Sequence, residues 1–266
     1  MTGPGDTEEL LYAYAVARDA DLPGSALTDV QGVAGGPVRA VRELGLAALV
    51  GTVPAAEFDE GPLRERLEDL PWLERVARGH QRVVDAATAA ACVLPLRLAT
   101  VYRDEAGLRR MLAAERAELG AALDRLDGRA EWGVKIWTEP EPVPAAPAAA
   151  PASGRDYLRR RGAERRARED GWRRAEDTAT EVHTTLLTLA EEARLHPPQD
   201  SRLSGRPGSN VLNAAYLVRH EHGPEFTSAV AAFADGADGL RVELTGPWAP
   251  YSFVAREPRT AGQVSR

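Results

Sequence analysis

The segment TEPEPVPAAPAAAPASG, residues 138–154, decides how the fold is divided. It carries five prolines, and proline lacks the backbone N–H that a helix interior or a central strand requires. Its Pro and Ala content is typical of a semi-extended linker. Because 266 residues are long for one compact core, two domains are expected, with one large domain as the alternative. We predict a first domain over residues 1–137, a linker over 138–153 and a second domain over 154–266.

The part before the linker is predicted to mix strands and helices that do not alternate regularly. Apolar and β-forming runs that end in turn residues predict strands, and helical spacing of apolar residues predicts helices. Pro95 requires a strand edge or a bulge, and Asp104 is a candidate N-cap. The expected strands are 10–17, one within 33–44, 45–53, 92–102 and 130–137, and the expected helices are two within 58–90 and one over 104–128.

The part after the linker is predicted to begin with a long helix over residues 157–193, or with two helices that meet near Gly171. Strands follow at about 200–203 and 211–218, then a helix over 224–234 and a strand over 240–246. This order of helix, strand, strand, helix and strand is most of a ferredoxin-like unit. The predicted fold class is therefore α+β, with a mixed first domain and a ferredoxin-like second domain.

Composition and motifs argue against several kinds of site. Cys92 is the only cysteine, which excludes an intramolecular disulfide, and its apolar neighbours indicate a core thiol. Lys135 is the only lysine and lies on a predicted strand, so no phosphate-binding loop is expected. His220 and His222 could face one metal, but an exposed loop is the favoured interpretation. We expect no catalytic residue, no cofactor and no metal.

The chain is expected to reside in the cytoplasm. Acidic residues near its start argue against a secretory signal, and its longest apolar run, 86–96, is too short to span a membrane. The net charge of −7 argues against general nucleic-acid binding. Residues 155–174, however, hold nine arginines against four acidic residues. A solvated or protein-contacting helix face is favoured there, and nucleic-acid binding stays an alternative.

Several stretches, in order along the chain, resemble the GvpL/GvpF family of gas vesicle proteins. LTGPWAPYSFV, residues 244–254, is the most specific, because Gly-Pro-Trp-x-Pro-Tyr-Ser-Phe is improbable by chance. Leu98 and Ala99 stand where the family usually has Phe and Gly, which puts in doubt any tight approach made by that Gly. The other similar stretches are LLYAYAVA at 10–17, VLPLRLATVY at 93–102, GRDYLRRR at 154–161 and NAAYLV at 213–218.

The resemblance implies two domains, the second a modified ferredoxin-like fold, and no catalytic site, cofactor or metal. It implies an accessory or minor structural protein of gas vesicle assembly, located in the cytoplasm and at the vesicle. The expected partners are the small hydrophobic shell protein and other accessory proteins, with no membrane or nucleic acid. The motif residues that become candidates for interaction are Pro95, Arg97, Thr100, Tyr157, Gly246, Pro247, Trp248, Tyr251 and Phe253.

The aromatic residues near the C-terminus are expected to have a structural role, with Trp248 and Phe253 packed under the long helix. A partly exposed contact for a shell subunit is the alternative. Two other functions stay open at this point. One is a small-molecule-binding or enzymatic protein with a cleft between its domains that contains His220 or His222, and the other is a nucleic-acid binder that uses the arginine-rich face.

Overall fold

The computed structural model describes residues 8–25, 27–139, 154–199, 208–236 and 239–254. Its contacts separate two compact units, one of Met1–Gly128 with Trp248–Arg266 and one of Arg129–Pro247. These bounds differ from the predicted domains. Strand β6 (Arg129–Thr138), expected at the end of the first domain, belongs to the second unit because it pairs with β8 (Asn210–Arg219) along its length. Residues 140–153 of the predicted linker lie outside the described residues.

The first unit is built on an antiparallel sheet with the strand order β2-β3-β1-β4, and β5 also pairs with β1. The register between β1 and β3 runs from Glu9 opposite Pro54 to Arg18 opposite Leu46, with an irregularity between Ala13 and Ala15. The strands are β1 (Glu9–Arg18), β2 (Val38–Glu43), β3 (Leu46–Pro54), β4 (Val93–Pro95) and β5 (Val101–Tyr102).

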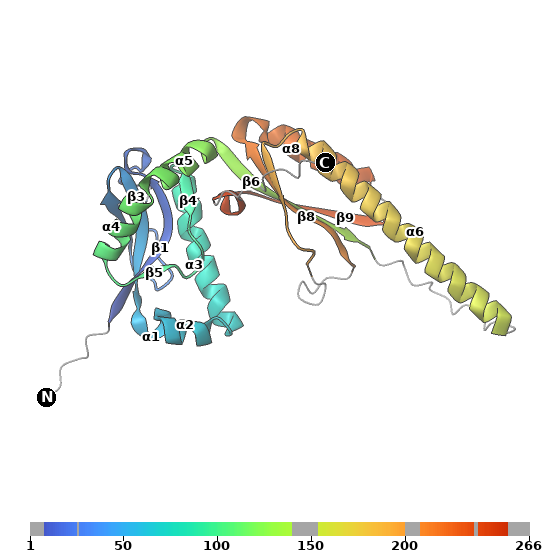
Figure 1. Ribbon diagram of the computed structural model, residues 1–266, viewed down its shortest axis with the longest axis horizontal. Helices are drawn as coiled ribbons and strands as arrows, with labels where there is room; N and C mark the ends of the chain where they lie inside the picture. The colour runs from blue at the N-terminus through green and yellow to red at the C-terminus, as the bar shows by residue number, and fades with distance from the viewer. Residues whose placement is uncertain (1–7, 26, 140–153, 200–207, 237–238, 255–266) are drawn as a thin grey trace, which may run out of the picture. The chain divides into compact units, whose positions relative to one another are not determined.

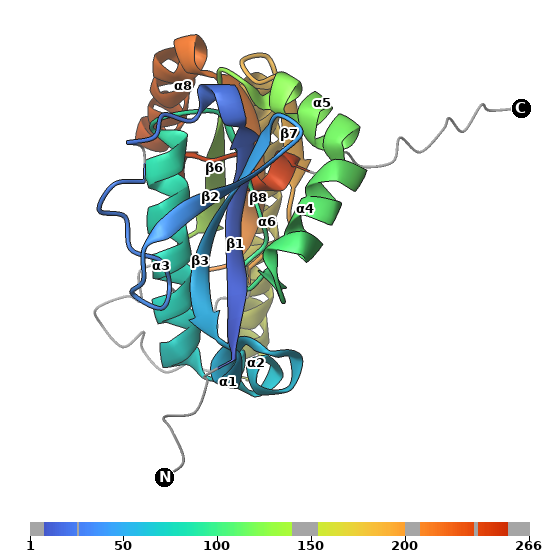
Figure 2. The same cartoon turned by 90° about the vertical axis from the view of Figure 1, so that its left-hand side faces the viewer.

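Helices cover both faces of this sheet. Residues 10–17 of β1 are buried without alternation, which requires cover on both sides. Figure 2 shows α3 (Leu70–Thr88) on one side of the strands and α4 (Glu105–Ala114) with α5 (Arg116–Leu126) on the other. Two shorter helices, α1 (Ala55–Phe58) and α2 (Glu60–Arg66), connect β3 to α3.

Several predictions for this unit need correction. The region predicted to hold two helices between 58 and 90 holds parts of three, because Pro62 and Pro71 each stand in a first helical turn, where proline is tolerated. The strand predicted over 92–102 is interrupted between β4 and β5, and Pro95 ends β4 at the sheet edge, as an edge position predicts. The helix predicted over 104–128 is two helices that meet at Glu115.

The second unit is a four-stranded antiparallel sheet with the strand order β7-β8-β6-β9. Its helices α6 and α8 pack on one face, around a core that includes Val134, Val182, Tyr216 and Phe226. In Figure 1 α6 extends well beyond the strands that its other end covers. Besides β6 and β8, the elements are α6 (Gly154–Leu187), β7 (Glu192–Leu195), α8 (Gly223–Gly236) and β9 (Leu240–Trp248).

The position of the long helix α6 was predicted, but its end was not. It passes through Gly171 without a break and ends at Leu187, six residues before the predicted end at 193. The residues that follow form β7, which pairs with β8 from Glu192 opposite Leu217 to Leu195 opposite Ala214. The strand predicted at 200–203 lies outside the described residues.

Candidate interaction site

Two tyrosines of β1 organise the centre of the first unit. Tyr12 and Tyr14 are fully buried on one face of the strand, with ring centroids 4.7 Å apart. The Tyr12 hydroxyl lies 3.0 Å from Nδ1 of His80, which α3 brings to the same face. The backbone N–H of Val33 donates to the Tyr14 hydroxyl at 2.9 Å. The hydroxyl groups of this otherwise apolar strand therefore have hydrogen-bond partners inside the core.

The VLPLRLATVY motif lies against these tyrosines. The N–H of Leu96 donates to the carbonyl of Tyr14 at 2.8 Å, and the N–H of Ala99 donates to the Tyr12 hydroxyl at 2.9 Å. Ala99 has φ +61°, a left-handed conformation that favours glycine. The close approach that the family's glycine suggested is therefore made here by an alanine.

The C-terminal motif reaches the same cluster. The Tyr251 ring lies 6.2 Å from the His80 ring, and Ala249 belongs to the same buried core. Phe253 is fully buried, and its carbonyl accepts a hydrogen bond from Arg125 Nη2 at 2.6 Å. Three motifs from the beginning, middle and end of the chain thus meet around Tyr12, Tyr14 and His80.

This arrangement corrects the expected packing of the C-terminal aromatics. Phe253 packs in the first unit, whereas the long helix under which it was expected belongs to the second. Trp248 is 41% exposed. Just before it, Gly246 has φ +121°, and a Cβ there would lie 2.8 Å from the Glu131 carbonyl oxygen, so only glycine fits. The Gly246–Pro247 peptide bond is cis.

The electrostatics of the cluster are those of a neutral core. Burial lowers the pKa of His80 to about 4, although the Leu96 backbone opposes this shift. Burial likewise raises the pKa of Tyr12 and of Tyr14. At neutral pH all three side chains are uncharged, so the cluster holds the three motifs together through packing and hydrogen bonds.

The candidate residues therefore separate into internal and exposed positions. Pro95, Phe253 and most of Tyr251 are internal, and Thr100 is half-buried with its hydroxyl donating to the Arg97 carbonyl at 2.8 Å. Arg97, Pro247 and Trp248 are exposed. Tyr157 lies on α6 of the second unit. Trp248, at 41%, is the exposed aromatic among the candidate residues whose burial is described.

The second unit contains a similar pair. The Tyr216 hydroxyl, from the NAAYLV motif in β8, lies 2.7 Å from Nδ1 of His183 on α6. The His183 ring also packs against the Tyr216 ring, with centroids 5.7 Å apart. His80 received no role from the sequence. The sequence does contain a signal for such a residue, because Tyr12 and Tyr14 lie two residues apart in an apolar strand. Once buried, their hydroxyls need hydrogen-bond partners in the core.

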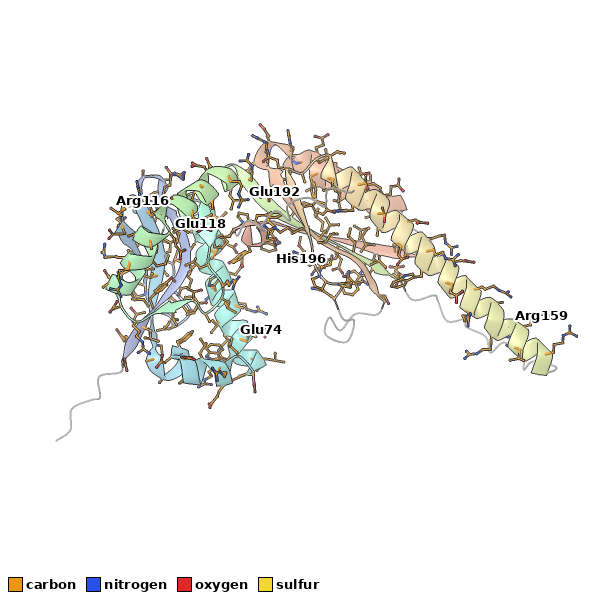
Figure 3. All side chains as sticks on the ribbon, viewed as in Figure 1. Glu74, Arg116, Glu118, Arg159, Glu192 and His196 are labelled. Atoms are coloured by element: carbon orange, nitrogen blue, oxygen red, sulfur yellow. The ribbon has the colours of Figure 1, made fainter. Side chains whose placement is uncertain are left out.

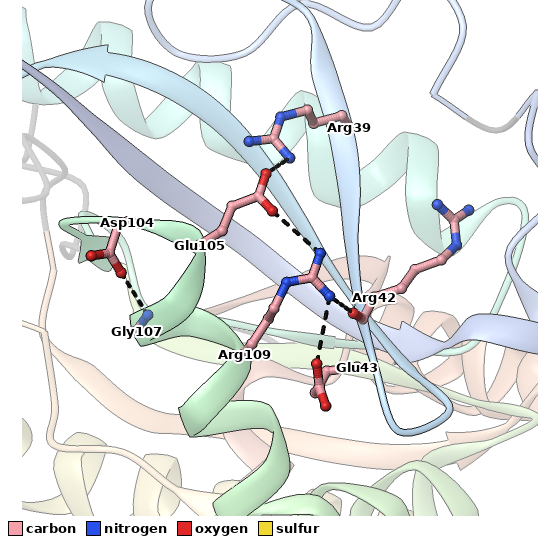
Figure 4. A network of polar contacts seen from close by, with 7 residues as sticks. All are labelled: Arg39, Arg42, Glu43, Asp104, Glu105, Gly107 and Arg109. Atoms are coloured by element: carbon pink, nitrogen blue, oxygen red, sulfur yellow. Dashed lines mark hydrogen bonds and ion pairs between the residues drawn. The ribbon is translucent and has the colours of Figure 1, made fainter.

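A surface network joins α4 to the edge strand β2 (Figure 4). Glu105 lies 2.6 Å from Arg39 and 3.3 Å from Arg109, and Arg109 also donates to the Arg42 carbonyl. Arg39 first, then Arg109, holds the pKa of the Glu105 carboxyl below its usual range. Asp104 caps α4 by accepting from the Gly107 N–H at 2.6 Å, which confirms the predicted N-cap. The network fixes a helix on a sheet.

The residues proposed for other chemistry are not brought together. His220 and His222 are both exposed in a single short turn, and Cys92 is half-buried with its Sγ 3.7 Å from the Leu123 carbonyl. Within the described ranges, His, Cys, Asp and Glu do not gather in a group of three that could hold a metal. The described helices also include none that is long and apolar enough to cross a bilayer.

The fold and the site define a mixed α/β protein with two antiparallel sheets whose sequence motifs meet in its core. Residues 10–255 match the family described as "Gas vesicle synthesis protein GvpL/GvpF". The chain belongs to this family, which places it among the proteins of gas vesicle formation. The family is not a known enzyme family.

Relatives and solved structures agree with this assignment. The chain is 52% identical to gas vesicle protein L of a Streptomyces species, over 93% of this chain and 94% of that protein. It is 25% identical to gas vesicle protein F of Haloferax mediterranei, over 92% of both chains. The crystal structure of GvpF from Anabaena superposes with a TM-score of 0.67 at 19% identity, covering 94% of this chain and 98% of that one. That of GvpF from Microcystis aeruginosa gives 0.66 at 20% identity, covering 93% and 99%.

Proposed function

We propose that this chain is an accessory or minor structural protein of gas vesicle assembly. It acts by contacts with the small hydrophobic shell protein and with other accessory proteins, in the cytoplasm and at the vesicle. The proposal assigns it no catalytic activity, cofactor or metal, and neither nucleic acid nor membrane as a partner. The observation that carries it is the 52% identity to a gas vesicle protein L over almost the full length of both chains.

The two units are proposed to be the two domains of the protein. In the second, the order β6, α6, β7, β8, α8, β9 and the sheet order β7-β8-β6-β9 support a ferredoxin-like domain. The first domain then includes residues 248–254 as well as everything before Arg129. This assignment replaces the boundaries predicted on either side of the proline-rich segment.

Trp248 is the proposed contact for a shell subunit. It is the exposed aromatic of a motif whose neighbours Ala249 and Phe253 are buried, so the core fixes the backbone that carries it. An exposed tryptophan on a fixed backbone offers a large apolar surface at a low cost in conformational entropy. The shell protein is hydrophobic, which suits such a contact.

The test is co-purification after co-expression. The tagged chain and the small hydrophobic shell protein of the same gene cluster are produced together, and the shell protein captured with the tag is quantified. We expect capture by the unchanged chain and a clear loss with Trp248→Ala. Leu195→Ala is the control, since Leu195 is 65% exposed and lies on β7 in the second unit. Failure of the unchanged chain to capture shell protein in any assembly state would refute the proposed function.

A further inference from the structure

The N-terminal part of α6 differs in charge from the rest of the chain. Residues 155–174, which we name the basic arm, contain nine arginines and four acidic residues, a net charge of +5 in a protein of net charge −7. All twenty residues lie within one helix, so the arm is about 30 Å long. Such a concentration of one charge on a rigid element favours a partner of the opposite charge.

The basic arm is also uncovered. Each of its residues whose burial the structure describes is exposed or half-buried, including Leu158 at 70% and Trp172 at 42%. The other half of α6 differs sharply, because Ala179, Val182 and Leu186 are buried in the core of the second unit. In Figure 3 Arg159 projects from the arm near the free end of the helix.

The apolar residues of the arm continue the stripe that is buried farther along. Leu158, Trp172, Ala179 and Leu186 are separated by fourteen, seven and seven residues, and Arg165 occupies the heptad position between Leu158 and Trp172. On the arm, the face that packs against the sheet therefore carries two separated apolar side chains, Leu158 and Trp172, and both are exposed. A helix gains most of its stability from packing one apolar face, and the residues that the structure describes provide no such packing for the arm.

Several arginines of the arm are available for ion pairs. Within the arm, Arg165 pairs with Glu169 at 3.1 Å and Arg173 with Asp170 at 3.8 Å. Among the described contacts, Arg155, Arg159, Arg166 and Arg174 have no acidic partner. Trp172 is oriented by its own hydrogen bond, because its Nε1 donates to Glu176 at 2.7 Å. The arm thus presents two exposed apolar side chains among arginines, four of which have no acidic partner in the described contacts.

We propose that the basic arm binds an acidic amphipathic helix of a partner protein. The partner would place leucine-like side chains against Leu158 and Trp172 and carboxylates beside Arg159 and Arg166. The inference deepens the proposed function. It rests on that function in one respect, which is that the chain acts through a protein partner. Nucleic acid is less suited, because the phosphate backbone makes no use of an exposed side chain such as Leu158 and four acidic residues lie along the arm.

The experiment measures binding of a designed probe to the full-length protein. The probe is a fluorescent peptide about four heptads long, with leucine at the core positions and glutamate at the flanking positions. A peptide with lysine in place of glutamate is the control ligand. We expect saturable binding of the acidic peptide only, followed by fluorescence anisotropy and weakened by salt.

Two double variants locate the binding. Arg159→Glu with Arg166→Glu reverses two exposed arginines seven residues apart on α6. Arg75→Glu with Arg82→Glu reverses two exposed arginines with the same spacing on α3. We expect the arm variant to weaken peptide binding by about tenfold or more and the α3 variant to leave it within about twofold. Circular dichroism of both variants should match that of the parent, because none of the four side chains is buried.

Several outcomes would overturn the proposal. They are no binding of the acidic peptide, equal binding of the lysine peptide, or equal weakening by both double variants. Tighter binding of an oligonucleotide that the arm variant abolishes would assign the arm to nucleic acid instead. Self-association that the arm variant abolishes, without peptide binding, would assign it to a second copy of the chain. Because the probe contains no shell protein, loss of shell capture with intact peptide binding would refute the proposed function alone.

Discussion

His80 couples the stability of the first unit to pH. Burial lowers the pKa of His80 in the folded protein to about 4 from its usual value of 6.5, so the unfolded chain binds a proton more readily. The stabilisation is complete above about pH 6.5 and is lost progressively as the pH falls toward 4. We expect a loss on the order of 2 kcal/mol between pH 7.5 and 5, measured by urea unfolding.

The variant His80→Gln tests this origin. The substitution removes the titrating group, so the free energy of unfolding should depend less on pH in the variant than in the parent. At pH 7.5 the free energy of unfolding should be lower in the variant. His220→Gln is the control, because His220 is exposed and should leave the pH dependence unchanged. An identical pH dependence in the parent and in His80→Gln would show that other groups cause it.

The left-handed backbone conformation of Ala99 should have a measurable effect on the free energy of unfolding. Its φ of +61° costs a non-glycine residue about 1–2 kcal/mol, whereas glycine adds about 0.5–1 kcal/mol of unfolded-chain entropy. Ala99→Gly should therefore raise the free energy of unfolding by about 0.5–1 kcal/mol. Ala121→Gly on the exposed side of α5 should lower it by about the same amount. Destabilisation by both changes would contradict the strain at Ala99.

At the scale of single elements, the sequence predicted those that long apolar patterns define. The strand expected at 10–17 is β1 and the one at 211–218 is β8, each within two residues of the observed ends. The break at Glu115 was missed because the buried leucines keep one stripe through both helices. β7 was missed because its four residues are only half-buried or exposed and it forms by pairing with a strand that comes later.

The candidate site was predictable only in part, because contacts between segments far apart in the sequence form it. The motif residues could be selected from the sequence, but their convergence depends on contacts between distant segments. His80 lies 68 residues from Tyr12, and no local pattern links them. The opposite exposure of Trp248 and Phe253 also depends on the tertiary packing of the segment, since both are aromatic residues of one motif.

The C-terminal segment is predicted to be part of the first unit's core. Phe253 is fully buried, so Phe253→Ala should lower the free energy of unfolding by about 3–5 kcal/mol. Trp248→Ala is the matched control and should change it much less, because Trp248 is exposed. Hydrogen exchange followed by mass spectrometry should show lost protection in β1 and α3 for the first variant only. Equal losses in both variants would contradict the placement of the two rings.

At the scale of the whole molecule, the chain leaves the first unit after Gly128 and returns to it at Trp248. The proline-rich segment was a misleading boundary, because β6 before it and α6 after it belong to the same unit. Prolines show where regular structure must stop. They do not show where the contacts of a chain pass from one core to another, which here occurs at the end of α5 and again at the end of β9.

A truncation tests this arrangement. A chain that ends at Pro247 lacks Ala249 and Phe253, both buried in the first unit, and removes the carbonyl that Arg125 binds. Compared with a chain that ends at Val254, it should lose several kcal/mol of stability in the first unit. The second unit ends at Pro247 and keeps its sheet except for Trp248, the last residue of β9, so its amides should stay protected from hydrogen exchange. If the shorter chain instead loses protection in β6 and β8 while β1 stays protected, the C-terminal motif stabilises the second unit and the division of the chain into these two units is wrong.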